Sequence, residues 1–211
     1  VGGHYMKRYL KPIKTAFLVS IAMFFICGFA YPMILTGASQ LIFPRQANGS
    51  LVEMNGEVVG SELVGQDFTD ERLFHCRPSA YNYNTYTAEE KEKGLYGGLS
   101  SGSNNYAVSN PKLTERLNQD IEQFLKDNPT VSKEEIPSDI ITASGSGLDP
   151  HISVDAANVQ IDRVAKNTKL SENKVKELIE QNTERKLFGV FGEETVNVLN
   201  LNLSVVKEIN S

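Results

Sequence analysis

The residues best suited to chemistry stand in one short segment, where Asp149 is followed by Pro150 and His151, with Asp155 shortly after. A carboxylate and an imidazole close together can exchange a proton, so this segment is a candidate acid–base pair or metal site. No nucleophile and no oxyanion donor stands at a meaningful spacing from it. His151 is equally suited to hydrogen bonding at the start of a helix, and we favour that structural role over catalysis.

A second candidate is the run of small residues GGLSSGSNN (97–105), whose glycines let the backbone approach a ligand or a partner closely. A Walker-type phosphate loop also needs a Lys and a Ser or Thr at its end, between a strand and a helix. This run has no lysine and no such context. We therefore favour a structural turn or a partner-docking loop over direct nucleotide binding. The residues that would form either site are Gly98, Ser101, Gly102, Ser103, Asn104 and Asn105.

Another loop of small residues, SGSGLDP (144–150), contains Asp149, and Arg77 precedes Pro78 in an irregular segment. Arg77 could pair with a buried carboxylate in a functional role, and we favour a structural salt bridge that holds the loop of Arg77 itself. The candidate residues for contact with a partner are Arg77, Ser144, Ser146, Asp149 and His151.

The cysteines and histidines do not form a metal-binding pattern. His4, His75 and His151 are scattered, and no Cys/His spacing fits a zinc site. Cys27 lies in an apolar run and Cys76 in the polar part of the chain, so we expect no disulfide between them. The net charge of −5 comes without a basic patch, which argues against a nucleic-acid partner.

An uncharged run over residues 15–44 is the element around which the chain is organised, with its apolar part at Thr15–Leu35. At about 1.5 Å per residue, a helix of this length just crosses a hydrocarbon layer of roughly 30 Å. We expect a transmembrane helix over residues 15–36, and the first five residues, VGGHY, look like a cloning or processing remnant. A cleaved signal peptide is the weaker alternative, because the run exceeds the usual signal length.

The charges beside this run predict its orientation. Lys7, Arg8, Lys11 and Lys14 precede it, whereas Arg45 is the one basic residue close behind it. Basic residues next to a span stay in the cytoplasm. We therefore expect residues 1–14 to be cytoplasmic and residues 37–211 to form one extracytoplasmic domain, in a single-pass protein of the cell membrane.

The remaining pattern mixes strands and helices without regular alternation, which favours an α+β domain. Asn55-Gly56 predicts a hairpin, with a third strand within 62–68. Asn110–Asn128 is a strong helix prediction, with Asn110 as its cap and Pro111 in first position. Further helices are expected from Ser153 or Asp155 to about residue 167 and from Ser171. Short strands are expected within 136–143 and, from the alternation of Leu and Asn, over 195–205.

Five blocks of the sequence carry a resemblance to a known family. They are GSLVEMNGEVVGSELVGQDF (49–68), FHCRPSAYNY (74–83), GGLSSGSNNYAVSNPKL (97–113), PSDIITASGSGLDPHISVDAANVQIDRVAK (137–166) and LFGVFGEETVNVLNLNL (187–203). In this order they resemble the C subunit of the Kdp-type potassium-transporting ATPase of bacteria and archaea. The chain departs from the family pattern at Cys76, where we expect Gly or Ser, and at Glu194-Thr195, where many members have Pro-Arg.

The resemblance implies a non-enzymatic subunit with one N-terminal span. Its implied partners are a potassium-channel-like subunit, a P-type ATPase subunit and a small single-span subunit, which between them handle potassium and ATP, so that no cofactor is expected on this chain. It also implies a catalytic chaperone that raises the affinity of the ATPase subunit for ATP, and it likens Gly98–Asn105 to the signature of ABC-type nucleotide sites.

ATP is cytoplasmic, whereas the basic flank of the span predicts an extracytoplasmic domain. We therefore expect an indirect effect on ATP binding, a coupling free energy between separate sites. Two alternatives remain at this point. One is a membrane-anchored hydrolase that uses Asp149 and His151, and the other is a stand-alone extracytoplasmic binding protein, for which the sequence offers no carbonyl-rich or acidic cage.

Overall fold

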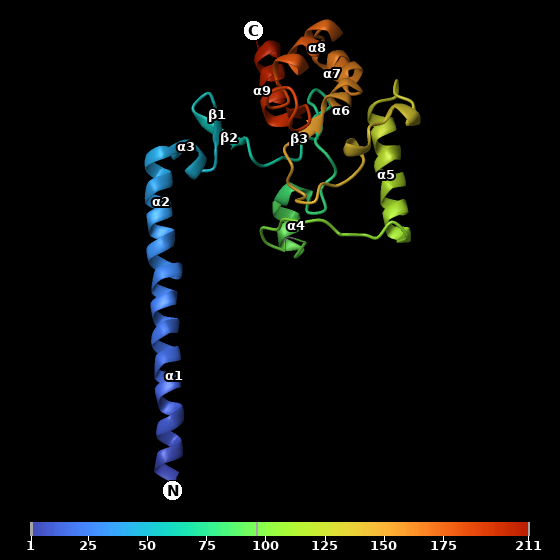
Figure 1. The fold of residues 1–211 in the computed structure, drawn as a ribbon. Coiled ribbons are helices and arrows are strands. Elements are labelled where there is room, and N and C mark those ends of the chain that lie inside the picture. Colours follow the sequence, from blue (N-terminus) through green and yellow to red (C-terminus); the bar gives the residue numbers. More distant parts are fainter. Residues whose placement is uncertain (1, 96, 211) are drawn as a thin grey trace. The chain divides into compact units, whose positions relative to one another are not determined.

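The computed structural model describes residues 2–95 and 97–210, with side chains from residue 11 onward. The chain forms two compact units, of which the first ends at Leu51 and the second begins at Val52 (Figure 1). Val1 of the expected N-terminal remnant and Tyr96, which precedes the small-residue run, lie outside the described residues, as does Ser211.

The first unit is helical. It consists of α1 (Gly2–Phe25), the π-helical segment η1 (Ile26–Ala30), α2 (Tyr31–Ile42) and the short α3 (Pro44–Ala47). Within the described residues one stretch, Lys11–Ile42, is long and apolar enough to cross a membrane, with a mean hydropathy of 2.2. None of that stretch is buried inside the protein, so its apolar side chains are free to face lipid.

Pro32 accounts for the π-helical segment in the middle of this span. Proline has no N–H, and its ring crowds the carbonyl four residues earlier, that of Gly28. The helix widens by one residue at this point: the N–H of Tyr31 bonds to the carbonyl of Ile26, five residues back. The span therefore continues to Ile42 without a break.

The second unit begins with the predicted hairpin, which is confirmed. Strands β1 (Leu51–Met54) and β2 (Glu57–Ser61) pair around Asn55 and Gly56, whose φ values of 55° and 84° suit a tight primed turn. The third strand predicted over 62–68 is wrong. In this segment Val64 makes one isolated bridge to Ser61, and the N–H of Gly65 donates instead to the carbonyl of Leu148 at 2.8 Å.

A three-stranded antiparallel sheet stands at the centre of the second unit. Its strands are β3 (His151–Ser153), β5 (Thr195–Asn197) and β4 (Thr183–Glu184), with β5 in the middle. The adjoining helices are α6 (Val154–Asn158), α7 (Ile161–Thr168), α8 (Glu172–Gln181) and α9 (Val198–Ile209). Fully buried side chains from these elements include Ile152, Val164, Val175, Val196, Leu201 and Val205. The α+β prediction is confirmed.

The strand predicted over 195–205 is wrong beyond Asn197. Helix α9 begins at Val198, because Asn197 caps it and its Oδ1 accepts the N–H of Asn200 at 3.2 Å. The buried side chains follow a helical spacing at Val198, Leu201 and Val205.

Helix α5 (Pro111–Asp127) follows its prediction, with Asn110 as the cap and Asn128 at the end. The strand predicted within 136–143 is wrong, since this stretch contains the 3-10 turn η4 (Ser138–Ile140), which follows another such turn, η3 (Lys133–Glu135). The hydroxyl of Thr142 donates to the carbonyl of Ser138 at 2.7 Å, a local bond that competes with strand pairing.

The two helices predicted after residue 150 both exist, but the first is divided. Ser153 caps α6, and a break at Val159 and Gln160 separates α6 from α7, whereas Ser171 caps α8 as predicted. Between the hairpin and α5 lie the short turns η2 (Asn82–Asn84) and α4 (Ala88–Glu92).

Candidate functional site

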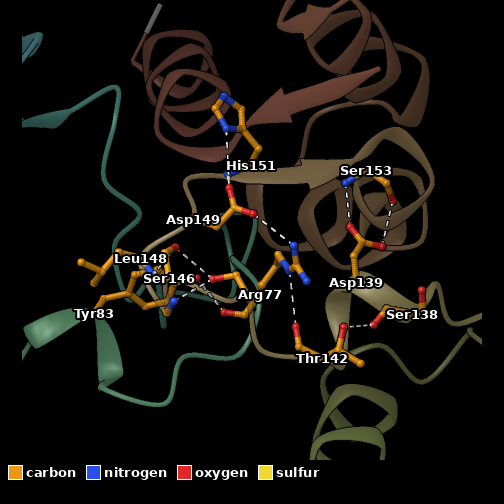
Figure 2. Close-up of polar contacts among 12 residues, drawn as sticks. Arg77, Tyr83, Ser138, Asp139, Thr142, Ser146, Leu148, Asp149, His151 and Ser153 are labelled. Atoms are coloured by element: carbon orange, nitrogen blue, oxygen red, sulfur yellow. Dashed lines mark hydrogen bonds and ion pairs between the residues drawn. The ribbon is translucent and has the colours of Figure 1, made fainter. Parts of the chain in front are cut away.

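Three of the predicted residues lie together, with Asp149 at their centre (Figure 2). Oδ2 of Asp149 contacts Nη1 of Arg77 at 3.1 Å. Oδ1 accepts the backbone N–H of His151 at 3.0 Å and lies 3.6 Å from Nδ1 of the His151 ring. Arg77 also donates through Nε to the carbonyl of Thr142 at 3.4 Å. Arg77 thus forms a salt bridge with a half-buried carboxylate, which ties segment 74–83 to the loop before β3.

The ring of His151 joins this group to the central sheet. Its Nε2 lies 3.8 Å from Oε1 of Glu184 on β4 and 3.5 Å from Nδ2 of Asn197 on β5. The Asp149 carboxylate, an acceptor beside Nδ1 of the ring, raises the pKa of His151, against the opposing effect of burial. The same contact, aided by Arg77, lowers the pKa of Asp149. The result is a row of polar side chains that runs from Arg77 through Asp149 and His151 to Glu184, in which His151 is charged only when its ring is protonated.

The two loops of small residues meet each other. The N–H of Gly102 donates to the carbonyl of Ser146 at 2.6 Å, and the hydroxyl of Ser101 donates to the same carbonyl at 3.0 Å. A Cβ on Gly147 would lie 2.5 Å from the carbonyl oxygen of Gly102, and Gly147 has a φ of +65°. Glycine is therefore required at this junction by both the backbone conformation and the close approach.

Segment 77–84 holds the same junction from a third side. The hydroxyl of Ser79 donates to the carbonyl of Gly147 at 2.6 Å, and that of Tyr83 donates to the carbonyl of Arg77 at 2.7 Å. The side chain of Asn84 bonds both the N–H and the carbonyl of Ser100, at 2.9 and 3.0 Å. Three segments that are distant in sequence are thereby joined into one polar junction, 77–84 with 100–102 and 144–149.

The structure brings some of the predicted residues to this junction and leaves others outside it. Ser144 and Ser146 are inside it, with their hydroxyls 3.3 Å apart. Ser103 and Asn105 bond to each other at 3.0 Å, and a Cβ added to Gly98 would meet nothing within 4 Å. Asn104 lines a shallow pocket next to Lys112. The run 97–105 therefore contributes Ser100, Ser101 and Gly102 to the junction, while Gly98, Ser103, Asn104 and Asn105 lie beyond it.

A second polar network, which the sequence patterns did not reveal, fixes the backbone of 71–75. Arg163, only 5% exposed, donates from Nη1 to the carbonyls of Glu71 and Leu73, each at 2.8 Å. The amide of Gln160 accepts the N–H of His75 at 2.8 Å and donates to its carbonyl at 3.3 Å. The sequence feature that could have predicted this network is the presence of polar residues on the buried face of a helix. Polar residues in a helix are usually exposed to solvent, so this feature is easily missed.

The arrangement around His151 offers no nucleophile. The side-chain partners of its ring are Asp149, Glu184 and Asn197, none of which is an activated hydroxyl or thiol. Burial raises the pKa of Cys76 to about 12, so its thiol stays protonated. Among the side chains of residues 11–95 and 97–210, no group of three or more His, Cys, Asp or Glu could hold a metal ion. The geometry fits a structural junction.

Comparison with known proteins places these features in one family. The model of the family described as "KdpC: K+-transporting ATPase, c chain" matches residues 13–207. The "Potassium-transporting ATPase KdpC subunit" of Clostridium kluyveri is 56% identical over 204 residues, which cover 97% of each chain. The subunits of the same name from Clostridioides difficile and Caldanaerobacter subterraneus subsp. tengcongensis are 54% and 49% identical, over 94% of this chain.

The match spans the apolar helix and nearly all of the second unit, and it confirms the resemblance drawn from the five blocks. The subunits of this family are accessory, and ATP hydrolysis belongs to a different subunit of the complex. The hypothesis of a hydrolase built on Asp149 and His151 is therefore wrong, as is that of a stand-alone binding protein. This chain belongs to the KdpC family, the c chain of the potassium-transporting ATPase.

Proposed function

We propose that the chain stabilises the transport complex and raises the effective affinity of its ATPase subunit for ATP indirectly, from the outer face of the membrane. Its partners would be the channel-like and the P-type ATPase subunits, with a small single-span subunit and membrane lipid around the helix. This is the catalytic-chaperone role without direct contact to ATP.

One observation carries the indirect mechanism. A phosphate cradle needs several backbone N–H groups that converge on open space. In the run 97–105, the N–H groups of Ser100 and Gly102 are already bonded to Asn84 and Ser146, at 2.9 and 2.6 Å. These two N–H groups are therefore committed within the protein, one to Asn84 and one to the junction with 144–149, which supports an indirect mechanism over direct nucleotide binding.

Orientation gives independent support. Four basic residues precede the span and one follows it closely, which favours a cytoplasmic N-terminus. A domain on the outer face cannot reach cytoplasmic ATP. An effect on ATP affinity must then travel through the packed helices of the partners, as a coupling of about 1–3 kcal/mol or about 5- to 150-fold.

The test compares purified complexes with and without this chain. We expect omission of the chain to raise the KM for ATP by about 5-fold or more, while the purified chain alone binds no ATP in equilibrium dialysis. Binding of ATP by the chain alone would contradict the indirect mechanism. An unchanged KM would contradict the effect on ATP affinity itself.

A further inference from the structure

A cavity of about 600 Å³ lies between α5 and segment 66–83 of the second unit. That volume falls within the range of sites that enclose a ligand or a partner's side chains. Its polar walls contain four carboxylates, Asp67, Glu71, Asp120 and Asp127. Its apolar walls include Phe68, Phe124 and Ile140. The cavity therefore combines an acidic lining with flat apolar surfaces.

The positive groups that line the cavity do not balance these carboxylates. Arg77 is one of them, but its guanidinium is engaged by Asp149, which does not line the cavity. His75 is the other, and burial lowers its pKa to about 4, so it is neutral at neutral pH. Arg163, which does not line the cavity, interacts with Asp127 and Glu71 and offsets part of their charge, so the lining keeps a smaller excess of negative charge.

Asp120 shows the effect of this excess most clearly. Asp120 forms a salt bridge within α5, with its Oδ2 3.5 Å from Nε of Arg116, and burial raises its pKa in spite of the lowering effect of that arginine. That oxygen is closed to solvent and accepts no hydrogen bond from the described residues. Burial also raises the pKa of Asp67 on the opposite wall. A cation between the two walls would stabilise the charged form of both carboxylates.

Helix α5 is itself incompletely covered. Its apolar stripe consists of Leu113, Leu117, Ile121, Phe124 and Leu125, all half-buried, and none of its residues is fully buried. Phe124 packs against the buried core. Figure 1 shows α5 at the edge of the second unit, apart from α7, α8 and α9. A strongly amphipathic helix whose apolar stripe is only half-buried leaves apolar surface available for a partner.

We propose that this cavity is a docking groove for a segment of another subunit of the complex that carries lysine or arginine. The aliphatic stem of such a side chain would pack on Phe68 and Phe124, while its charged head would meet Asp67 and Asp120. The proposal rests on the proposed function as an accessory subunit and names one surface by which the chain binds its complex.

The geometry favours a side chain on a partner over an inorganic cation. A metal ion needs several oxygen ligands that converge on one point, and no such group exists among the described residues. The cavity is instead lined by carboxylates and aromatic side chains from both α5 and segment 66–83. That arrangement matches an elongated, amphipathic cation.

A photo-cross-linking amino acid at Gln123, which lines the cavity, tests the groove in the intact complex. The control places the same group at Glu122, an exposed neighbour on α5 that does not line the cavity. We expect the product from position 123, identified by mass spectrometry, to contain a Lys- or Arg-bearing segment of a partner subunit. The product from position 122 should lack that segment.

A charge-removing pair of variants completes the test. Asp67→Asn with Asp120→Asn should reduce the yield of this cross-link by roughly tenfold, as expected when two charge-assisted contacts are lost. Glu92→Gln with Glu122→Gln removes the same charge from exposed sites outside the cavity and should leave the yield unchanged. Urea unfolding of both variants separates lost docking from lost folding.

Three results would overturn the proposal. They are a cross-link from position 123 to a segment without basic residues, equal yields from the two double variants, and a cross-link that an excess of spermidine leaves unchanged although the spermidine occupies the cavity of the purified chain. The comparison of the KM for ATP in complexes with and without this chain is independent of these outcomes. A chain that still lowers the KM for ATP but gives no basic cross-link keeps the proposed function and loses this groove.

Discussion

Asn202, on α9, holds the backbone of Phe74 by both of its polar groups. Its Oδ1 accepts the N–H of Phe74 at 2.7 Å, and its Nδ2 donates to the carbonyl of Phe74 at 2.9 Å. Asn202 is 2% exposed and Phe74 is fully buried. The side-chain amide of Asn202 therefore supplies the two hydrogen bonds that a neighbouring strand would give to Phe74, whose segment belongs to no sheet. It also fixes the position of the backbone that leads to Arg77.

Replacement of Asn202 by Ala should destabilise the protein severely. Two buried backbone groups would lose their partner, at about 1–3 kcal/mol each. We expect a loss of about 2–5 kcal/mol in the free energy of unfolding, measured by urea titration of the full chain in detergent. Asn200→Ala on the same helix is the matched control, and an equal loss in that variant would contradict the assigned role.

The junction of the two small-residue loops depends on Gly147. Gly147→Ala places a Cβ 2.5 Å from the carbonyl oxygen of Gly102, at a φ of +65°. We expect a loss of about 1–3 kcal/mol in stability and a weaker effect of the chain on the KM for ATP. Gly145→Ala is the control, because its Cβ would meet nothing within 4 Å. Equal behaviour of the two variants would show that the junction has no role.

The pH dependence of stability should reveal the pair of Asp149 and His151. The pKa of His151 is raised above its ordinary value of 6.5, so the stability it contributes is fully present below that value. That contribution is lost as the pH rises through the higher pKa of the folded state. Asp149 has a lowered pKa, and its contribution is lost only as the pH falls through a value below 3.8.

The measurement compares wild type with His151→Asn at about pH 6 and about pH 9. The variant should lose more stability at the lower pH, by less than about 1 kcal/mol because the ring is partly exposed. His75→Gln should behave in the opposite way. Burial lowers the pKa of His75 to about 4, so the folded protein favours the neutral ring. As the pH falls below about 6.5, the unfolded chain takes up a proton at this ring that the folded protein does not, and the folded state loses stability. Identical pH profiles for the two variants would contradict these environments.

Several elements could be predicted because local chemistry decides them. Asn55-Gly56 has few alternatives to a tight turn, and Asn110-Pro111 marks the start of α5. The apolar run is equally unambiguous as one span. In each case the signal lies within a few neighbouring residues, and no distant contact has to be known.

The remainder depends on contacts between distant segments. The alternation of Leu and Asn after Thr195 predicted a strand with the leucines on one face and Asn202 on the other. In the structure Asn202 faces Phe74, 128 positions away, and the segment is helical. Arg163 and Gln160 bind the backbone of 71–75, a contact that no nearby sequence pattern predicts. The pairing of Ser146 with Gly102 has no local signature at all.

The most direct test of the account is the side of the membrane on which the second unit lies. Glu57, exposed on β2 beside the hairpin turn, would be changed to Cys in a chain with Cys27→Ala and Cys76→Ala. A partner variant would carry its single Cys at Lys11 instead. Intact cells would be treated with a membrane-impermeant thiol reagent, with lysed cells as the labelling control.

The account predicts that Glu57→Cys is labelled in intact cells and that Lys11→Cys is labelled only after lysis. Any effect on ATP affinity would then have to pass through the partner subunits. The reverse pattern, with Glu57→Cys protected until lysis, would contradict the orientation drawn from the basic flank. It would also reopen direct contact between the cytoplasmic nucleotide and this chain.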